Sequence, residues 1–293
     1  MVLPFQHIKL NFHTLKGYDG KNGNSDATPC QKHSYGMKIL LTNDDGIYAP
    51  GLAALERQLQ QLGDVTIAAP LTEQSGVGHS ITYLKPLMAR EMFDDEGRRR
   101  GWAVEGSPAD CVKLAICALL PERPDLVVSG INSGLNAGIN VLYSGTVAAA
   151  IEGAFFRTTS VAVSLEYHEA ARYDIAAELA VGVIEQMLTK QNATNHLYNM
   201  NIPMAALENP ADVKIVPMAT SPWGEDFRKK IDPRGRPYYW ANGLQPDPPS
   251  HEETDLSALR AGNITLTPLN FDMTQREKLS EMRTWNLGKC EKA

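Results

Sequence analysis

Cysteine is scarce in this chain of 293 residues. Only Cys30, Cys111, Cys117 and Cys290 occur, and no two of them have the Cys-x-x-Cys spacing. A disulfide-rich scaffold or a cysteine-based zinc module is therefore excluded as the main theme. A reducing compartment fits, so we expect a cytoplasmic protein. Cys111 and Cys117 fall in an apolar, helix-like stretch, which predicts small buried thiols.

Long apolar runs and excess positive charge are also missing. No run approaches the roughly 20 residues that cross a bilayer, so no membrane partner is expected. Lys and Arg number 28 against 34 Asp and Glu, a net charge of −6, which argues against polymeric nucleic acid as a partner. The chain lacks both a Gly-x-Gly-x-x-Gly fingerprint directly after a strand and a Gly-x-x-x-x-Gly-Lys-Ser/Thr loop. The usual dinucleotide and nucleoside triphosphate cradles are thus excluded.

Residues 1–36 differ from the rest of the chain. They have no arginine and no apolar segment, so they match neither a transit peptide nor a signal peptide. Their second half is rich in Gly, Asn, Ser and Asp, and we expect an unstructured N-terminal extension. The first convincing element opens at Met37, and one hypothesis is that Met37 is the native start.

Apolar runs of strand length alternate with helical patterns from Met37 to about residue 205. The predicted strands are 38–42, 65–69, 125–129, 159–165 and 197–202, and the predicted helices are 51–62, 107–120, 144–156 and 174–188. This alternation predicts an α/β domain with a mostly parallel sheet, the catalytic core over 37–205. Residues 81–106 interrupt the alternation of strands and helices, and we expect them to form a hairpin insert.

Beyond residue 205 the alternation fades. Segments 213–218 and 263–267 resemble strands, and a Pro-rich, polar and aromatic stretch lies between them. We therefore expect 206–293 to be a C-terminal arm that packs on the core and serves oligomerisation.

Polar residues follow three of the predicted strands. These segments are 43–46, 75–80 and 130–138. Because the carboxyl ends of parallel strands share one edge of a sheet, we expect all three to face the same crevice.

The adjacent carboxylates Asp44 and Asp45 repel each other unless a cation or proton neutralises them. Oxygen donors from aspartate, serine and asparagine suit Mg²⁺ or Mn²⁺ better than a thiophilic metal. The alternative is that both aspartates are ordinary loop and capping residues. His79, in the second loop, is more simply a structural histidine than a catalytic one.

The third loop runs into a helix start at Ser144, Gly145 and Thr146. Ser144 is a plausible N-cap, Gly145 permits close approach of a ligand, and Thr146 adds a hydroxyl. Free amides and the helix dipole make such an end an anion site, unless the serine is a plain cap. A metal site beside an anion site indicates phosphate chemistry.

Several motifs follow one another along the chain: Lys38-Ile-Leu-Leu-Thr-Asn-Asp-Asp-Gly46, Ser75-Gly-Val-Gly-His-Ser-Ile-Thr82, Gly106-Ser-Pro-Ala-Asp-Cys-Val-Lys113, Ser129-Gly-Ile-Asn-Ser-Gly-Leu-Asn136, Tyr143-Ser-Gly-Thr-Val147, Glu152-Gly-Ala154, Asp232-Pro-Arg-Gly-Arg-Pro-Tyr-Tyr-Trp240 and Ile264-Thr-Leu-Thr-Pro268. In this order, the motifs together resemble the SurE survival-protein family. The resemblance covers about Met37 to Asn270.

The resemblance implies a Rossmann-like three-layer sandwich and a divalent-metal-dependent phosphatase. The implied substrates are nucleoside 5′- and 3′-monophosphates and short-chain polyphosphate, in nucleotide salvage and stress survival. It implies one Mg²⁺ or Mn²⁺ per subunit, and it assigns metal binding to Asp44, Asp45, Ser75 and Asn132, catalysis to Asp44, Asp45 and Asn132, and phosphate binding to Ser144, Gly145 and Thr146.

The resemblance also implies a homodimer or homotetramer in which subunits exchange a β-rich C-terminal arm. The interface residues would then include Arg234, Arg236, Tyr238, Tyr239 and Trp240.

Direct hydrolysis by water is the expected mechanism, and two alternatives remain open. A haloacid-dehalogenase-like phosphatase would form a phospho-aspartate, but it requires Asp-x-Asp where this chain has Asp44-Asp45 without a spacer. A nucleotide sensor would bind AMP or GMP without turnover.

Overall fold

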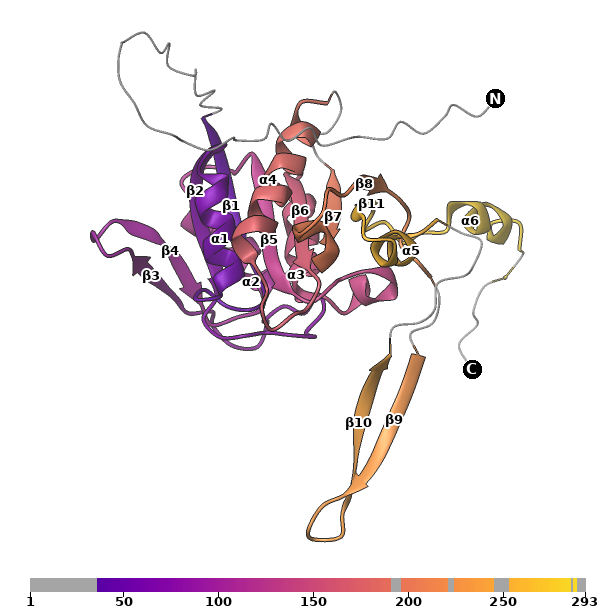
Figure 1. The fold of residues 1–293 in the computed structure, drawn as a ribbon. Helices are drawn as coiled ribbons and strands as arrows, with labels where there is room; N and C mark the ends of the chain where they lie inside the picture. The colour runs from indigo at the N-terminus through magenta and orange to yellow at the C-terminus, as the bar shows by residue number, and fades with distance from the viewer. Residues whose placement is uncertain (1–35, 191–195, 221–223, 245–252, 286, 289–293) are drawn as a thin grey trace.

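A nine-stranded sheet with helices on both faces forms the body of the molecule (Figure 1). The computed structural model describes residues 36–190, 196–220, 224–244, 253–285 and 287–288. The predicted N-terminal extension therefore lies outside the described residues, apart from Gly36. None of the described helices is long and apolar enough to cross a membrane.

The strand order is β3-β4-β2-β1-β5-β6-β7-β11-β8. Six neighbouring strands, from β4 to β7, run parallel. Strand β3 is antiparallel to β4, and β11 is antiparallel to β7 but parallel to β8. The strands of this sheet are β1 (Met37–Thr42), β2 (Gly63–Pro70), β3 (Ala89–Phe93), β4 (Arg99–Val104), β5 (Leu126–Ser133), β6 (Thr159–Leu165), β7 (Leu197–Ile202), β8 (Val213–Ile215) and β11 (Ile264–Leu269). The predicted mostly parallel α/β sheet is confirmed.

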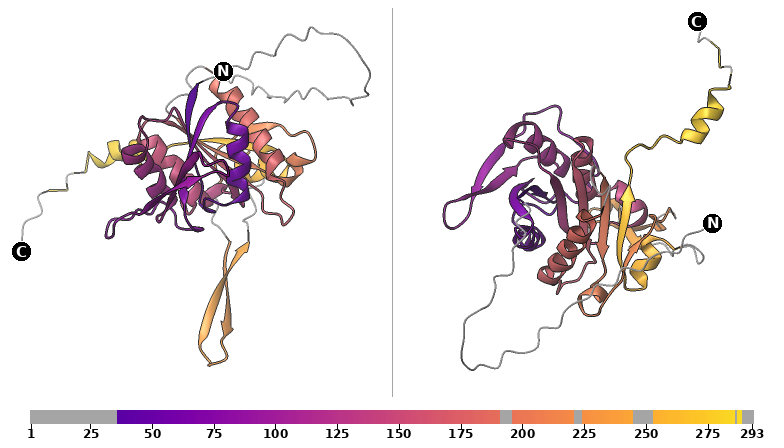
Figure 2. Two further views of the ribbon diagram at one scale, coloured as in Figure 1. Left: turned by 90° about the vertical axis from the view of Figure 1, so that its left-hand side faces the viewer. Right: turned by 90° about the horizontal axis from the view of Figure 1, so that it is seen from above.

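Helices cover the two faces of the sheet in pairs. On one face α1 (Pro50–Leu59) packs beside α4 (Tyr173–Leu188), and on the other α2 (Pro108–Leu114) packs beside α3 (Gly145–Phe155). Figure 2, seen from above, shows the sheet between these two layers. The predicted three-layer sandwich is therefore confirmed.

Local sequence explains where the elements begin. Strand β1 is buried on both faces because Ile39, Leu40 and Leu41 are all apolar. Helix α2 begins with a capping box, in which Ser107 accepts from the Asp110 amide and Asp110 accepts from the Ser107 amide.

Strand β5 is longer than predicted. The sequence predicts that it ends at residue 129 and that a loop begins at Gly130, but β5 continues to Ser133 after an irregularity in its pairing with β6. Gly130, with φ of 145°, makes this continuation possible: a Cβ there would lie 2.3 Å from the carbonyl oxygen of Val163. Asn132 consequently lies at a strand end, paired with Ser164, and not in a free loop.

The predicted helix over 107–120 has an unexpected last turn. After α2 the chain forms one π-helical turn, Ala115–Leu119, before Pro121. The prediction of a buried Cys117 is wrong, because this residue lies in the π turn and is exposed, whereas Cys111 is buried as predicted.

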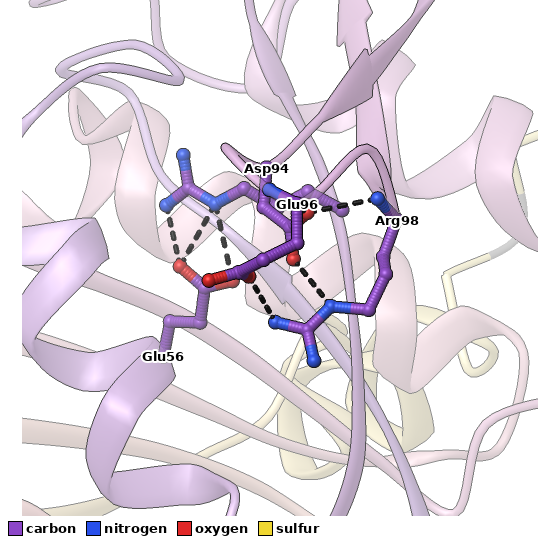
Figure 3. A network of polar contacts seen from close by, with 5 residues as sticks. Glu56, Asp94, Glu96 and Arg98 are labelled. Atoms are coloured by element: carbon purple, nitrogen blue, oxygen red, sulfur yellow. Dashed lines mark hydrogen bonds and ion pairs between the residues drawn. The ribbon is translucent and has the colours of Figure 1, made fainter.

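The predicted hairpin insert at 81–106 is confirmed as β3 and β4. Arg100 on β4 donates to both carboxylate oxygens of Glu56 on α1, which ties the hairpin to the core. Near the turn Asp94 and Glu96 both accept from Arg98 (Figure 3).

Some C-terminal elements belong to the nine-stranded sheet, and others project from the core. Strands β8 and β11 extend the sheet beyond β7, and α5 (Asp255–Arg260) precedes β11. The hairpin of β9 (Gly224–Ile231) and β10 (Pro237–Leu244) projects away from the core, as does α6 (Arg276–Met282), in a different direction (Figures 1 and 2).

Candidate functional site

The candidate site lies at the carboxyl ends of β1 and β5, where the order of the sheet reverses. From β1 the chain passes through α1 to β2 on one side, and β5 lies on the other side of β1. In open α/β sheets this topological switch point forms the crevice that binds ligands. Asp44 and Asp45 follow β1 here, and Asn132 lies near the end of β5.

A tight turn presents the two aspartates. The side chain of Asn43 both donates to the Gly46 carbonyl (2.9 Å) and accepts from the Gly46 amide (3.2 Å). Asp44 is buried, with 4% of its surface exposed, and Asp45 is only partly buried. The Asp45 carboxylate accepts from the backbone amide of Ser133 on β5 (3.1 Å), so the first and third polar segments meet.

The N-terminus of α3 lies against Asp44. The hydroxyl of Thr146 donates to Oδ1 of Asp44 (2.5 Å), and a Cβ added to Gly145 would lie 3.2 Å from Oδ2. Ser144 is the N-cap, as predicted, and its Oγ accepts from the Val147 amide. The predicted carboxylate pair and the predicted anion site are therefore parts of one site.

The second polar segment also reaches the carboxylate pair. The amide of Gln74 donates to the backbone carbonyl of Asp44 (2.8 Å), which places the neighbouring Ser75 beside the pair. The Ser75 hydroxyl itself donates to the Glu73 carboxylate (2.6 Å). Backbone and side-chain hydrogen bonds thus join the three segments that were expected to face one another.

The side-chain nitrogen of Asn132 is already used in a hydrogen bond. Its Nδ2 donates to the carbonyl of Gly134 (2.7 Å), which leaves Oδ1 as the atom that could bind a cation. Amide oxygens are among the donors that hard divalent cations accept.

The two aspartates carry raised pKa values. Burial raises the pKa of Asp44 to about 6, repulsion from Asp45 adds to the rise, and the Thr146 hydrogen bond opposes it. Burial also raises the pKa of Asp45, opposed by the Ser133 amide and helped by repulsion from Glu73. Both ionised forms are thus destabilised without a neighbouring positive charge.

A hard divalent cation fits this donor set. The two adjacent carboxylates carry negative charge that no neighbouring cation compensates among the described contacts. Hydroxyl and amide oxygens lie in the neighbouring segments. No group of three or more His, Cys, Asp or Glu side chains that could hold a metal occurs in the part of the chain that the structure describes. The predicted ligand set of Asp44, Asp45, Ser75 and Asn132 contains only two such side chains, and its role in binding a metal stays a prediction.

A buried amide network behind the site was not predicted. Asn136 donates from Nδ2 to Ser164 (2.9 Å), and its backbone carbonyl accepts from Asn199 (2.7 Å) and Asn201 (3.2 Å). Its Nδ2 also lies 3.5 Å from the Thr146 hydroxyl that holds Asp44. The available signal was the pair of asparagines at alternate positions of the otherwise apolar β7, because such residues are buried only when hydrogen-bonded.

A second unpredicted cluster joins His79, Glu152 and Lys113. Glu152 on α3 is only 2% exposed and accepts from Nε2 of His79 (2.9 Å) and Nζ of Lys113 (3.1 Å). Burial alone would raise the pKa of Glu152, but these two hydrogen bonds lower it below its usual value. The carboxylate is therefore ionised at neutral pH.

The fold and the site together define a class: Rossmann-like α/β proteins with a carboxylate pair beside a helix N-terminus at the switch point. A family model described as "Survival protein SurE" matches residues 39–225. This chain belongs to the SurE family.

Curated relatives and a solved structure resemble most of the chain. The protein named 5′-nucleotidase SurE from Rhodopirellula baltica is 58% identical over 86% of this chain and 99% of its own length. Its namesake from Heliobacterium modesticaldum is 43% identical over 85% of this chain and 92% of its own length. The crystal structure of SurE protein from Aquifex aeolicus superposes with a TM-score of 0.72 at 35% identity, covering 84% of this chain and 98% of that one.

Proposed function

We propose that this protein is a divalent-metal-dependent phosphatase that hydrolyses nucleoside 5′- and 3′-monophosphates, and also short-chain polyphosphate. The observation that carries the proposal is the Thr146–Asp44 hydrogen bond (2.5 Å), which joins the carboxylate pair to the N-terminus of α3. The names of the curated relatives support hydrolysis of a phosphate monoester, and the family description supports a role in survival. Nucleotide salvage and a cytoplasmic location are part of the proposal.

Four residues would hold one Mg²⁺ or Mn²⁺: Asp44, Asp45, Ser75 and Asn132. When bound, the cation polarises a phosphate oxygen and lowers the pKa of water at the site. For Ser75 this role requires its hydroxyl to turn from Glu73, its present partner, toward the carboxylate pair.

The chain's own groups bind and orient the phosphate. The amides of the first turn of α3, beginning at Gly145, and the dipole of this eleven-residue helix stabilise negative charge on the phosphate oxygens. Water attacks phosphorus as the bond to the nucleoside oxygen breaks. One of the two aspartates accepts the proton of the water through the oxygen that is free of Thr146 or Ser133, and the proton passes to the leaving oxygen.

Protein stripped with a chelator tests this function. We expect no release of phosphate from AMP until Mg²⁺ or Mn²⁺ is restored, and then turnover on 5′- and 3′-monophosphates and on polyphosphate. Binding of AMP without turnover at any metal concentration would contradict the proposal and favour a nucleotide sensor. A covalent phosphoenzyme trapped by acid quench would instead favour the phospho-aspartate mechanism.

We also propose that the C-terminal arm makes the protein a homodimer or homotetramer by exchange between subunits. The β9–β10 hairpin supports this, because an isolated two-stranded hairpin is marginally stable in water. Tyr239 and Trp240 on β10 are 59% and 63% exposed, which leaves two large rings for a partner surface. Arg234 and Arg236 lie at the turn of the same hairpin, where Asp232 accepts from both backbone amides.

Charge substitution on β10 tests the interface. Because buried aromatic anchors dominate such interfaces, we expect the double variant Tyr239→Asp, Trp240→Asp to weaken self-association at least tenfold in sedimentation velocity. Phe93→Asp, which changes an exposed ring on the other hairpin, is the matched control and should leave the assembly unchanged. An unchanged sedimentation profile for the double variant would place the interface elsewhere.

A further inference from the structure

The segment that carries Ser75 is anchored at both ends within the site. On one side the Gln74 amide donates to the Asp44 carbonyl (2.8 Å), and on the other the Gly78 amide donates to the Tyr143 carbonyl (3.0 Å), one residue before the cap of α3. Residues 75–77 thus cross from the carboxylate pair to the N-terminus of α3. Their position depends on what holds the chain just beyond Gly78.

His79 is the first side chain after residues 75–77, and contacts with helix α3 hold it in place. Its Nε2 donates to Glu152, and its ring stacks on Phe155 with centroids 5.4 Å apart. Glu152 and Phe155 both belong to α3, the helix whose first turn lies against Asp44. The link between His79 and Glu152 therefore fixes the Ser75 segment to the same rigid helix that carries the anion site.

The rest of the segment is tied to α2 instead. The Ser107 hydroxyl donates to the Ser80 carbonyl (2.6 Å), and Asp110 accepts from the amide and hydroxyl of Thr82 (2.9 and 2.7 Å). Lys113, also on α2, donates to Glu152 but has no hydrogen bond or ion pair with the segment among the described contacts. Of the two side chains that donate to Glu152 among the described contacts, His79 is the one on the Ser75 segment.

The buried carboxylate makes this link strong. An ionised carboxylate that is 2% exposed needs a hydrogen-bond donor, and a hydrogen bond to a charged group is stronger than one between neutral groups. Partners outside the ligand shell commonly set metal affinity, typically by 10- to 100-fold.

We propose that Glu152 is a positioning residue: through His79 it holds the backbone of the Ser75 segment beside the carboxylate pair and so sets the affinity of the site for its divalent cation. This inference rests on the proposed function for the identity of the cation site, but it concerns residues that do not themselves touch the cation. Lys113 neutralises Glu152 and has no part in the positioning.

Mn²⁺ binding to the full-length protein tests the proposal, followed by the electron paramagnetic resonance signal of the free ion, without nucleotide. We expect His79→Ala to weaken Mn²⁺ binding about tenfold, while kcat at saturating Mn²⁺ stays within about twofold. His79→Gln, whose Nε2 can still donate to Glu152, should bind Mn²⁺ within about twofold of the unchanged protein. Glu152→Ala should match His79→Ala, and because His79 is exposed, its variants remain informative if Glu152→Ala does not fold.

Two controls separate positioning from general loosening. Lys113→Met removes the α2 contact of Glu152, and Glu56→Gln weakens a partly shielded ion pair between α1 and β4. Both variants should keep Mn²⁺ affinity within about twofold. In the double variant Ser75→Ala, His79→Ala we expect no further loss beyond Ser75→Ala alone, because His79 acts through Ser75.

The outcomes distinguish this inference from the proposed function. If the wild-type protein binds no Mn²⁺ and releases no phosphate from AMP, both the proposed function and the positioning role are wrong. Unchanged protein that binds Mn²⁺ while His79→Ala binds it equally well would overturn the positioning role alone. Equal losses for His79→Ala and Lys113→Met, or additive losses with Ser75→Ala, would also overturn it.

Discussion

Replacing Asp45 with asparagine lowers kcat/KM for metal-stimulated hydrolysis of AMP by about 10²- to 10³-fold. The variant keeps the shape of the side chain and an oxygen that can accept from Ser133 (3.1 Å), but it removes one of the two negative charges. Electrostatic stabilisation by a bound cation contributes several kcal/mol to such reactions, and each tenfold in rate is about 1.4 kcal/mol. The measurement is phosphate release over a series of Mn²⁺ and AMP concentrations.

Asp45 is the better choice than Asp44 for this test. Asp44 is almost fully buried and accepts from Thr146, so its replacement would also disturb packing at the start of α3. The matched control is Asp64→Asn, on an exposed position of β2 at the opposite edge of the sheet. Wild-type kcat/KM in Asp45→Asn would contradict the assignment, and an equal loss in Asp64→Asn would indicate a general effect on stability.

Valine at position 145 should lower kcat for AMP at least about 100-fold while the protein still folds. A Cβ at Gly145 would lie 3.0 Å from Cβ of Asp44 and 3.1 Å from Cγ of Pro108, and valine adds two further carbons. The backbone there has an ordinary helical conformation, so the cost is overpacking, about 1–3 kcal/mol of stability. Displacement of a catalytic group by about 1 Å can cost 10²-fold in rate.

The chain offers a close control for this substitution. Gly182 lies within α4, and a Cβ there would meet no atom within 4 Å. Gly182→Val should therefore retain full activity, and Gly145→Ala should fall between the unchanged protein and Gly145→Val. Full kcat in Gly145→Val would show that the first turn of α3 does not depend on its contact with Asp44.

The sheet was largely predictable because buried parallel strands are continuous apolar runs. The strands 159–165 and 197–202 have the predicted bounds, since each is flanked by polar or turn residues. The end of β5 was not predictable, because glycine at 130 resembles a strand end. The requirement for glycine is visible only in the structure, where the Val163 carbonyl lies so close to Gly130 that a side chain there would clash with it.

The main parts of the site were predictable from their positions after strands. The parallel sheet alone brings Asp44, Asp45, Asn132 and the cap Ser144 to one edge. The side-chain pairings were not predictable: Thr146, expected to contact phosphate, donates to Asp44, and Ser75 donates to Glu73. Such choices depend on distances between segments far apart in the chain, which neither periodicity nor composition encodes.

His79 and Glu152 illustrate the same limit. Each was noted within a motif, yet their pairing joins residues 73 positions apart across a loop and a helix. A buried glutamate on the alanine-rich α3 was the available signal, since an ionisable residue on an apolar helix face needs a partner. The partner itself follows only from the fold.

Anomalous diffraction from crystals grown with Mn²⁺ tests the central claim most directly. The account predicts one strong peak per chain within coordination distance, about 2.0–2.6 Å, of side-chain oxygens from Asp44, Asp45 and Asn132, with Ser75 completing the set. A protein that crystallises with full occupancy of Mn²⁺ at some other place, and with none between these residues, would contradict it.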